Sequence, residues 1–412
     1  MKNYKTKFLV TVCIIFVFNF LLLTNNIHAE DKKEFTPLFP INISHKLPQP
    51  EKTFNEVKDL ILNNYYSDKI SEEALYWAAI KGMLRHISPP ENPGLAKIWT
   101  PDEYEEVLLT MHGEQISLGI KSSYNAGDGS LTISEVIDGS PSDGALQPMD
   151  RILRINSEKL KGRPVSDINR LLKGEEGEKI TLTINRDVEV FDVIIERKKF
   201  NVPNLVVTPL TKGVLLVELK SFSMDISKQL KEKLESYRED EIKNVIIDLR
   251  NNQGGMFIEA LRIVELFLPE KSILLRTLQR ENGLQNYVSV NKVPFEFDIA
   301  ILINDKTASS AEILAAALQD HRKALLVGSG TFGKGVFDRT YTLENNFRIR
   351  FITGAMYSPV GRTWQGKGLT PDFLVDQDEN TLKAIMKLTP EERLRKDVGL
   401  ITAYKLLNRE PD

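Results

Sequence analysis

The pattern of apolar and polar residues divides the chain into successive zones. Apolar residues recur at helical spacing between residues 54 and 83, which predicts a helical N-terminal region. From about residue 110 to 199 the spacing becomes that of strands separated by turn residues. Beyond residue 200, mostly apolar runs alternate with helical patterns, as expected for a sheet covered by helices. The second zone is predicted to contain strands at 131–136, 151–156, 179–185 and 191–196 and a short helix at 165–172.

Two strand-turn-helix steps stand out in the third zone. An apolar strand at 245–249 runs into the sequence DLRNNQGG, and a helical pattern follows. A second strand at 299–303 leads through a polar, Ser-rich turn into another helical pattern. Both steps place unpaired backbone N–H groups at a helix N-terminus, where negative charge is favoured. The tail from 380 to 407 is predicted to be helical, and it could serve oligomer contacts. The whole order of elements predicts a multidomain, mixed α/β (α+β) protein.

Length and composition support a globular protein with a large core. The 412 residues are 42% hydrophobic, which is enough for two or three domains. The formal charge of −3 argues against a nucleic-acid-binding surface. The only cysteine, Cys13, lies near the N-terminus, so no disulfide is expected.

The N-terminus has the composition of a secretory signal. Three lysines precede an apolar run at residues 8–23, and a small residue, Ala29, follows. We therefore expect cleavage after Ala29 and an exported protein, periplasmic or otherwise extracytoplasmic. An uncleaved membrane anchor is the alternative, because the run is only slightly shorter than a membrane span. Residues 30–51 are aperiodic and contain several prolines, which indicates a linker.

Two side chains in the third zone could perform covalent chemistry. Ser309 lies at or just before the first turn of a predicted helix, and Lys334 lies in a loop between Gly333 and Gly335. A serine becomes a nucleophile when a base removes its proton, and a neutral amine can be that base. The simpler interpretation makes Ser309 an N-cap, with Glu312 completing a capping box, and Lys334 a solvated loop residue. The local pattern leaves both interpretations open.

Phosphate binding is a further interpretation of the same loop. Residues 328–334 (GSGTFGK) fit the pattern G-x-x-x-x-G-K. Gly335 then stands where a Ser or Thr would bind Mg²⁺, and the residues that follow are predicted to form a strand instead of a helix. The context therefore excludes a P-loop.

The segments TASSAEI and TFGKG together resemble the C-terminal processing proteases, also called tail-specific proteases, which are Ser-Lys peptidases with a PDZ domain. Lys334 lies 25 residues after Ser309, a separation that matches this family and selects Ser309 over Ser310 as the nucleophile. The resemblance implies that Lys334 is the base. It also implies an oxyanion hole made by the amide of Ser310 and that of Gly255, with Gly254 as a second choice. It implies no metal and no cofactor.

The resemblance covers residues 52–375 and implies a division into domains. A helical N-terminal region (52–109) precedes a PDZ domain (110–199), a crotonase-like ββα protease core (200–375) and a helical C-terminal region (376–412). The PDZ domain would bind substrate C-termini through its carboxylate loop and would prefer apolar C-terminal residues. Homodimer formation and an activating adaptor also fit the family. The carboxylate loop consists of Ser117, Leu118, Gly119 and Ile120.

The chain departs from the family pattern at two positions. Met149 stands where a glycine is usual, so the turn before Asp150 could be shaped differently. Asp338 stands where many members carry a Gln that orients the lysine amine. A carboxylate in contact with Lys334 would favour the ammonium form and oppose base catalysis. Asp320 could also support the site, although a helix-end aspartate more often satisfies turn amides.

Two other classes of protein are alternatives to a protease. One is a non-catalytic PDZ adaptor with a degenerate protease core, against which Ser309, Lys334 and the Gly254-Gly255 turn argue. The other is a crotonase-like enzyme acting on acyl-CoA, since that fold also pairs oxyanion amides. The signal segment and the PDZ domain make the second alternative a poor fit.

Overall fold

The computed structural model describes residues 46–88, 93–211, 213–237 and 242–408. The described residues fall into two units, which divide between Leu75 and Tyr76. The predicted signal segment and most of the predicted linker lie outside the described residues. Within the described part of the chain, no helix has both the length and the apolar character needed to cross a bilayer.

The predicted helical N-terminal region is confirmed. Helix α2 (Pro50–Asn64) starts with proline in its first turn, where the missing N–H costs nothing. Helix α3 (Glu72–His86) has two glutamates in its first turn and Arg85 and His86 in its last, which complements the helix dipole. Helix α4 (Pro101–His112) begins with a capping box from Thr100 and ends at a left-handed glycine.

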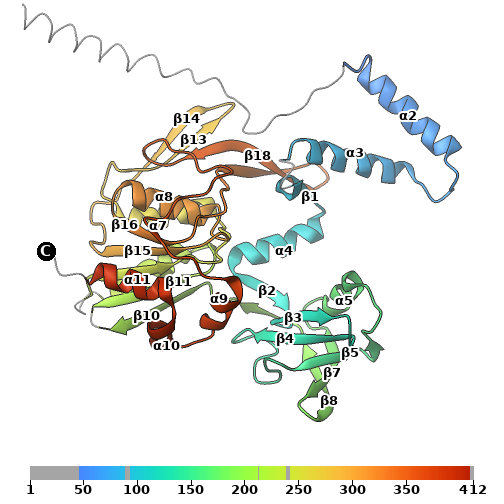
Figure 1. The fold of residues 1–412 in the computed structure, drawn as a ribbon. Helices are drawn as coiled ribbons and strands as arrows, with labels where there is room; N and C mark the ends of the chain where they lie inside the picture. The colour runs from blue at the N-terminus through green and yellow to red at the C-terminus, as the bar shows by residue number, and fades with distance from the viewer. Residues whose placement is uncertain (1–45, 89–92, 212, 238–241, 409–412) are drawn as a thin grey trace, which may run out of the picture. The chain divides into compact units, whose positions relative to one another are not determined.

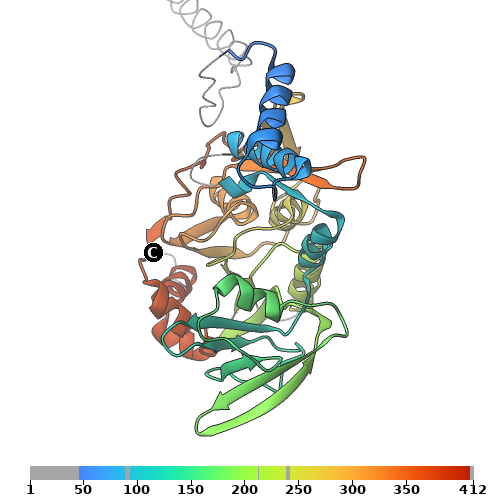
Figure 2. The same ribbon diagram turned by 90° about the vertical axis from the view of Figure 1, so that its right-hand side faces the viewer.

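The second zone forms a compact sheet domain with α5 (Val165–Leu172) lying across one face (Figure 2). Alternate residues of each strand point to the core, so that Ile180, Leu182 and Ile184 are fully buried. Met149 adopts a left-handed conformation with φ 77°, so the turn keeps the backbone that glycine would favour. The strands follow the order β3 (Ile120–Asn125), β4 (Ser130–Val136), β5 (Arg151–Ile155), β7 (Lys179–Arg186) and β8 (Glu189–Glu196), with β6 (Glu158–Lys159) paired to β5. A separate antiparallel pair is formed by β2 (Glu114–Ser117) and β9 (Lys198–Asn201).

A six-stranded sheet forms the centre of the third zone (Figure 1). All of its pairings are parallel except the one between β10 and β11. Every residue of β12 is buried, as expected for a strand covered on both faces. Its strands follow the order β10 (Leu205–Thr211), β11 (Val214–Leu219), β12 (Asn244–Asp248), β15 (Asp298–Ile303), β16 (Ala324–Gly328) and β19 (Phe373–Leu374).

Helices cover both faces of this sheet. One face packs against α6 (Ile226–Ser236), α7 (Phe257–Phe267) and α8 (Ser310–Asp320). The other face packs against α11 (Val398–Leu407), which buries Leu400 and Ala403. The predicted helical tail is thus confirmed, and α11 completes the core of its own chain. Two short helices precede it, α9 (Glu379–Ile385) and α10 (Pro390–Lys396).

A second, antiparallel sheet carries the strand that follows Lys334. Strand β17 pairs with β18, and their register shifts between Phe337 and Asp338, which marks a β-bulge. This sheet consists of β1 (Lys97–Trp99), β18 (Arg348–Tyr357), β13 (Ile273–Gln279), β14 (Gly283–Val288) and β17 (Val336–Thr342). The described chain is therefore a mixed α/β protein with several sheets, as predicted.

Candidate active site

Ser309 lies on a strained turn between β15 and α8. Its backbone angles are φ 57° and ψ −116°, a conformation that residues with a side chain rarely adopt. Such a conformation costs on the order of 1–3 kcal/mol and persists where surrounding structure enforces it. Here the enforcing element is α8, in which every residue from Ser310 to Leu318 is buried. A serine on a sharp strand-to-helix turn has the geometry of a nucleophile elbow.

Glu312 joins the Ser309 turn to the Lys334 loop. Its side chain is fully buried, and one carboxylate oxygen accepts hydrogen bonds from the backbone N–H groups of Ser309 (2.8 Å) and Lys334 (2.9 Å). The other oxygen accepts from the N–H of Gly333 (2.7 Å) and the hydroxyl of Thr331 (2.6 Å). The backbone nitrogens of Ser309 and Lys334 therefore lie within two hydrogen-bond lengths of each other. The capping role and a catalytic site are compatible, because the same carboxylate serves both.

The electrostatic state of Glu312 reflects a balance between two effects. Burial raises the pKa of its carboxyl, and the four hydrogen bonds offset part of that rise, so the pKa remains above its ordinary value. Sequence analysis identified Glu312 only as a capping residue. The contacts with the lysine loop span about twenty residues of chain, and no local pattern signals them.

Lys334 is bonded to Asp338 in this structure. Its ammonium donates to Asp338 Oδ2 at 3.2 Å, and Arg350 Nε lies 3.8 Å from the other carboxylate oxygen. Both side chains of the Lys334–Asp338 pair are about one-fifth exposed. Among the described residues, no hydrogen bond joins Lys334 to Ser309. The contact with Asp338, which the sequence left open, is therefore present.

Local irregularity explains how residues 334 and 338 can touch. On a regular strand, residues four apart lie about 13 Å from each other. Lys334 lies two residues before β17, which begins at Val336, so residues 334–338 do not form one regular strand and the two side chains can meet. The loop itself is held by Trp364 Nε1, which donates to the Lys334 carbonyl at 3.1 Å.

The Gly254-Gly255 turn lies against Ser309 and Ser310. Both glycines have positive φ, 100° and 144°, and a Cβ on Gly254 would approach Ser310 N to 3.0 Å. The Gly254 N–H donates to Asn252 Oδ1 at 2.8 Å, so it is already used. Within the described part of the chain, the N–H groups of Gly255 and Ser310 have no acceptor. Two such groups on adjacent turns are what an oxyanion hole requires, and of the two glycines only Gly255 offers one.

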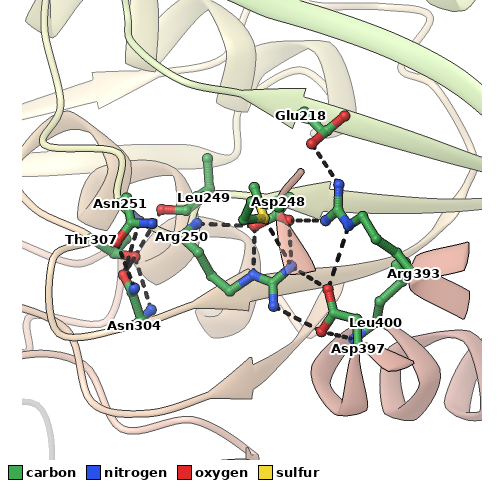
Figure 3. A network of polar contacts seen from close by, with 11 residues as sticks. Glu218, Asp248, Leu249, Arg250, Asn251, Asn304, Thr307, Arg393, Asp397 and Leu400 are labelled. Carbon is green, nitrogen blue, oxygen red and sulfur yellow. Dashed lines mark hydrogen bonds and ion pairs between the residues drawn. The ribbon is translucent and has the colours of Figure 1, made fainter. Parts of the chain in front are cut away.

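Hydrogen bonds lock the two turns together. Ala308 N–H donates to the Asn252 carbonyl at 2.9 Å, and Ser310 Oγ donates to the Gly255 carbonyl at 2.9 Å. Asn251 and Asn304 exchange a pair of bonds at 2.9 and 3.0 Å (Figure 3). The relative position of the two turns is therefore set by hydrogen bonds from both backbone and side chains.

The remaining predicted residues lie elsewhere. Asp320 Oδ2 accepts from the N–H of Val360 at 3.1 Å, and its other oxygen pairs with Arg362, so it holds a loop and has no bond to Ser309 or Lys334. No group of three or more His, Cys, Asp or Glu side chains in the described ranges could hold a metal ion.

The predicted carboxylate loop lies at the start of β3. Gly119 has φ 75°, and its N–H donates to Ser117 Oγ at 3.1 Å. Leu118 is buried in the core of the sheet domain, with Ile120 packed partly against it. The loop thus has a left-handed residue at Gly119 and a buried apolar residue at Leu118.

Comparison with known proteins gives the family. Residues 213–375 match the model of Peptidase family S41, and residues 106–185 match that of the PDZ domain. A "Probable CtpA-like serine protease" of Staphylococcus aureus (strain bovine RF122 / ET3-1) is 29% identical over 345 residues, which cover 82% of this chain and 68% of that protein. The protein of the same name from Staphylococcus saprophyticus is 29% identical over 329 residues, 79% of this chain and 65% of that protein.

Two solved structures share the fold. The photosystem II D1 C-terminal processing protease matches with a TM-score of 0.50 and 18% identity, over 84% of this chain and 99% of that chain. An S41 protease from Bacteroides fragilis NCTC 9343 matches with a TM-score of 0.57 and 16% identity, over 87% and 98%. The chain therefore contains a Peptidase family S41 domain and a PDZ domain, and it is similar to serine proteases of the CtpA type.

Proposed function

We propose that this protein is an exported serine endopeptidase that recognises the C-termini of its substrates and hydrolyses peptide bonds with a Ser309–Lys334 dyad. One observation carries the proposal. The Glu312 carboxylate binds the backbone of both residues, so the nucleophile and the base are held on one buried anchor although they are far apart in sequence.

The proposed reaction proceeds through an acyl-enzyme. Neutral Lys334 accepts the Ser309 proton while Ser309 Oγ attacks the peptide carbonyl, and the oxyanion is stabilised by the N–H groups of Gly255 and Ser310. The C–N bond then breaks, and the leaving amine takes the proton from Lys334. Water attacks the ester, Lys334 again accepts and returns a proton, and Ser309 is regenerated.

The ion pair with Asp338 imposes a condition on this reaction. An ammonium that donates to a carboxylate already holds its proton and cannot act as a base. Lys334 must therefore leave Asp338 and lose that proton before Ser309 is activated. Arg350 can hold Asp338 meanwhile, since its Nε lies 3.8 Å from that carboxylate.

Substrate delivery is assigned to the PDZ domain. The C-terminal carboxylate would bind at Ser117, Leu118, Gly119 and Ile120, and the chain would pair with β3 by strand addition. The apolar residues of this loop, Leu118 and Ile120, favour substrates whose C-terminal residue is apolar. Export rests on the composition of residues 1–29, with membrane tethering if that segment is retained. A homodimer and an activating adaptor remain proposed partners.

The test is the intact mass of a partly unfolded protein with an apolar C-terminus, followed over time with the full chain or with Ser309→Ala. We expect fragments with the wild type only. The same substrate with a C-terminal carboxamide should be cleaved more slowly, because the loop loses its anion. If neither protein cleaves while both bind the tail peptide, the non-catalytic PDZ adaptor replaces the protease.

A further inference from the structure

The C-terminal helices contribute buried charges to the protease core. The match to Peptidase family S41 ends at residue 375, before α10 and α11 begin. Arg393 on α10 and Asp397 at the junction of the two helices are nevertheless 1% and 0% exposed. A charged side chain is buried at this depth only when it is paired and hydrogen-bonded. The partners of Arg393 and Asp397 therefore show which part of the core the C-terminal helices are bonded to.

These two residues pair with the last residue of β12, Asp248, and with Arg250 just after it (Figure 3). The Asp397 carboxylate accepts from two nitrogens of Arg250 at 2.9 and 2.7 Å. Asp248 accepts from Arg393 at 2.8 Å and from the Arg250 side chain at 2.9 and 2.6 Å. Arg393 also donates to Glu218 on β11 at 2.6 Å. Two arginines and three carboxylates thus join two strands of the central sheet to the tail.

Arg250 is also the start of the turn that ends at Gly255. Its backbone N–H donates to Asp248 at 3.1 Å, so one carboxylate fixes both its backbone and its side chain. The next residue, Asn251, is bonded to the turn that carries Ser309 through Asn304. The ion network therefore fixes Arg250, the residue at which the Gly254-Gly255 turn begins.

We propose that Arg393 and Asp397 are positioning residues, which hold the turn through Asp248 and Arg250 so that the Gly255 N–H points at the reacting carbonyl oxygen. This inference rests on the proposed oxyanion role of Gly255. Stabilisation by a fixed donor depends on its position in the transition state, so these residues act on kcat more than on KM. The C-terminal helices are then part of the catalytic apparatus.

Asp397→Asn separates the ion network from helix capping. Asp397 also caps α11 by accepting from the Leu400 N–H at 3.2 Å, and asparagine is an equally good N-cap. The substitution therefore removes the charge and keeps the cap. The matched control is Asp378→Asn, which makes the same change at the exposed N-cap of α9. We expect kcat of Asp397→Asn to fall about 10- to 100-fold, with KM within about threefold, and the control to equal wild type.

Hydrogen exchange supplies a readout independent of activity. We expect the amides of residues 249–256 to exchange faster in Asp397→Asn, while those of β7 in the PDZ domain keep their wild-type rates. A kcat within twofold of the control with unchanged exchange in the turn would overturn the inference. Equal acceleration in both segments would also overturn it, because that result indicates general destabilisation.

A second variant covers failure of Asp397→Asn to fold. Glu218→Gln removes only the outermost partner of Arg393, and we expect a several-fold loss of kcat with the same local change in exchange. No change in either quantity would refute the positioning role. Wild type and Ser309→Ala are run alongside. If wild type shows no Ser309-dependent cleavage, the proposed function fails and the catalytic part of the inference fails with it, while the exchange measurement still decides whether the tail holds the turn.

Discussion

Replacing Glu312 by glutamine should loosen the Ser309 turn and the Lys334 loop at once. The carboxylate accepts four hydrogen bonds, two on each oxygen. An amide of the same shape has only one carbonyl oxygen, so its NH₂ group must face one pair of donors. If it faces Thr331, the hydroxyl can rotate and the Gly333 N–H alone is left without an acceptor. In the other orientation, the N–H groups of Ser309 and Lys334 both lose theirs.

The magnitude follows from these contacts. A buried N–H without an acceptor costs about 1–3 kcal/mol, and each retained bond weakens by about 1 kcal/mol when its acceptor loses charge. Relief of the desolvation cost of the carboxylate offsets part of this loss. We expect a net decrease of about 2–4 kcal/mol in the free energy of unfolding of the core. Displacement of the loops by about 1 Å would lower kcat on the order of 100-fold.

The assay is kcat, KM and Tm for Glu312→Gln beside a matched control. Glu103→Gln changes the same capping-box glutamate at the start of α4, where the side chain is exposed and accepts from Thr100 N–H. We expect the control to lower stability by about 1 kcal/mol or less, with unchanged kcat. Wild-type kcat and Tm in Glu312→Gln would refute the anchoring role.

The same residue predicts an acid limb in the activity of the wild type. Because the folded pKa of Glu312 lies above its ordinary value of 4.5, protonation begins at higher pH than for an exposed glutamate. Its contribution to stability is present below the unfolded pKa and is lost as pH rises through the folded pKa. Activity has the opposite pH dependence from stability. It falls as pH decreases, because the ionised carboxylate is the form that holds both loops. Glu312→Gln should lack this limb.

Three further predictions concern the surroundings of the dyad. Asp338→Gln should raise the cleavage rate, because the Lys334 side chain no longer donates to a carboxylate at 3.2 Å and can turn towards Ser309. Equal cleavage rates for wild type and variant would refute this. Gly255→Ala should lower kcat about 100- to 1,000-fold. The new Cβ would lie 2.5 Å from the Phe222 carbonyl oxygen and would displace the residue 255 N–H that is proposed to bind the oxyanion. A near-normal kcat would rule out this N–H as an oxyanion donor. Burial raises the pKa of Asp248, but the neighbouring arginines outweigh burial, so the pKa lies below its ordinary value. The contribution of Asp248 to stability is therefore present above about pH 4 and is lost as pH falls. Acid unfolding that begins elsewhere in the chain would contradict this prediction.

The sequence by itself predicted much of the secondary structure. The period of the apolar residues is a local property, and it predicted the PDZ strands, the buried strand β12 and the helical tail close to their observed bounds. The Ser309 and Lys334 motifs were also visible, because each is a short segment with its own turn chemistry. The resemblance to one protease family came from these motifs in combination.

Only the tertiary structure decided which side chains meet. The Lys334–Asp338 contact depends on the path of the loop before β17, which no local pattern indicates. Glu312 looked like a cap alone, yet it also binds a loop about twenty residues later. Arg393 and Asp248 form an ion pair although they are 145 residues apart. Hydrogen bonds and ion pairs across such separations are set by how the sheet and helices pack, and packing depends on the whole chain at once.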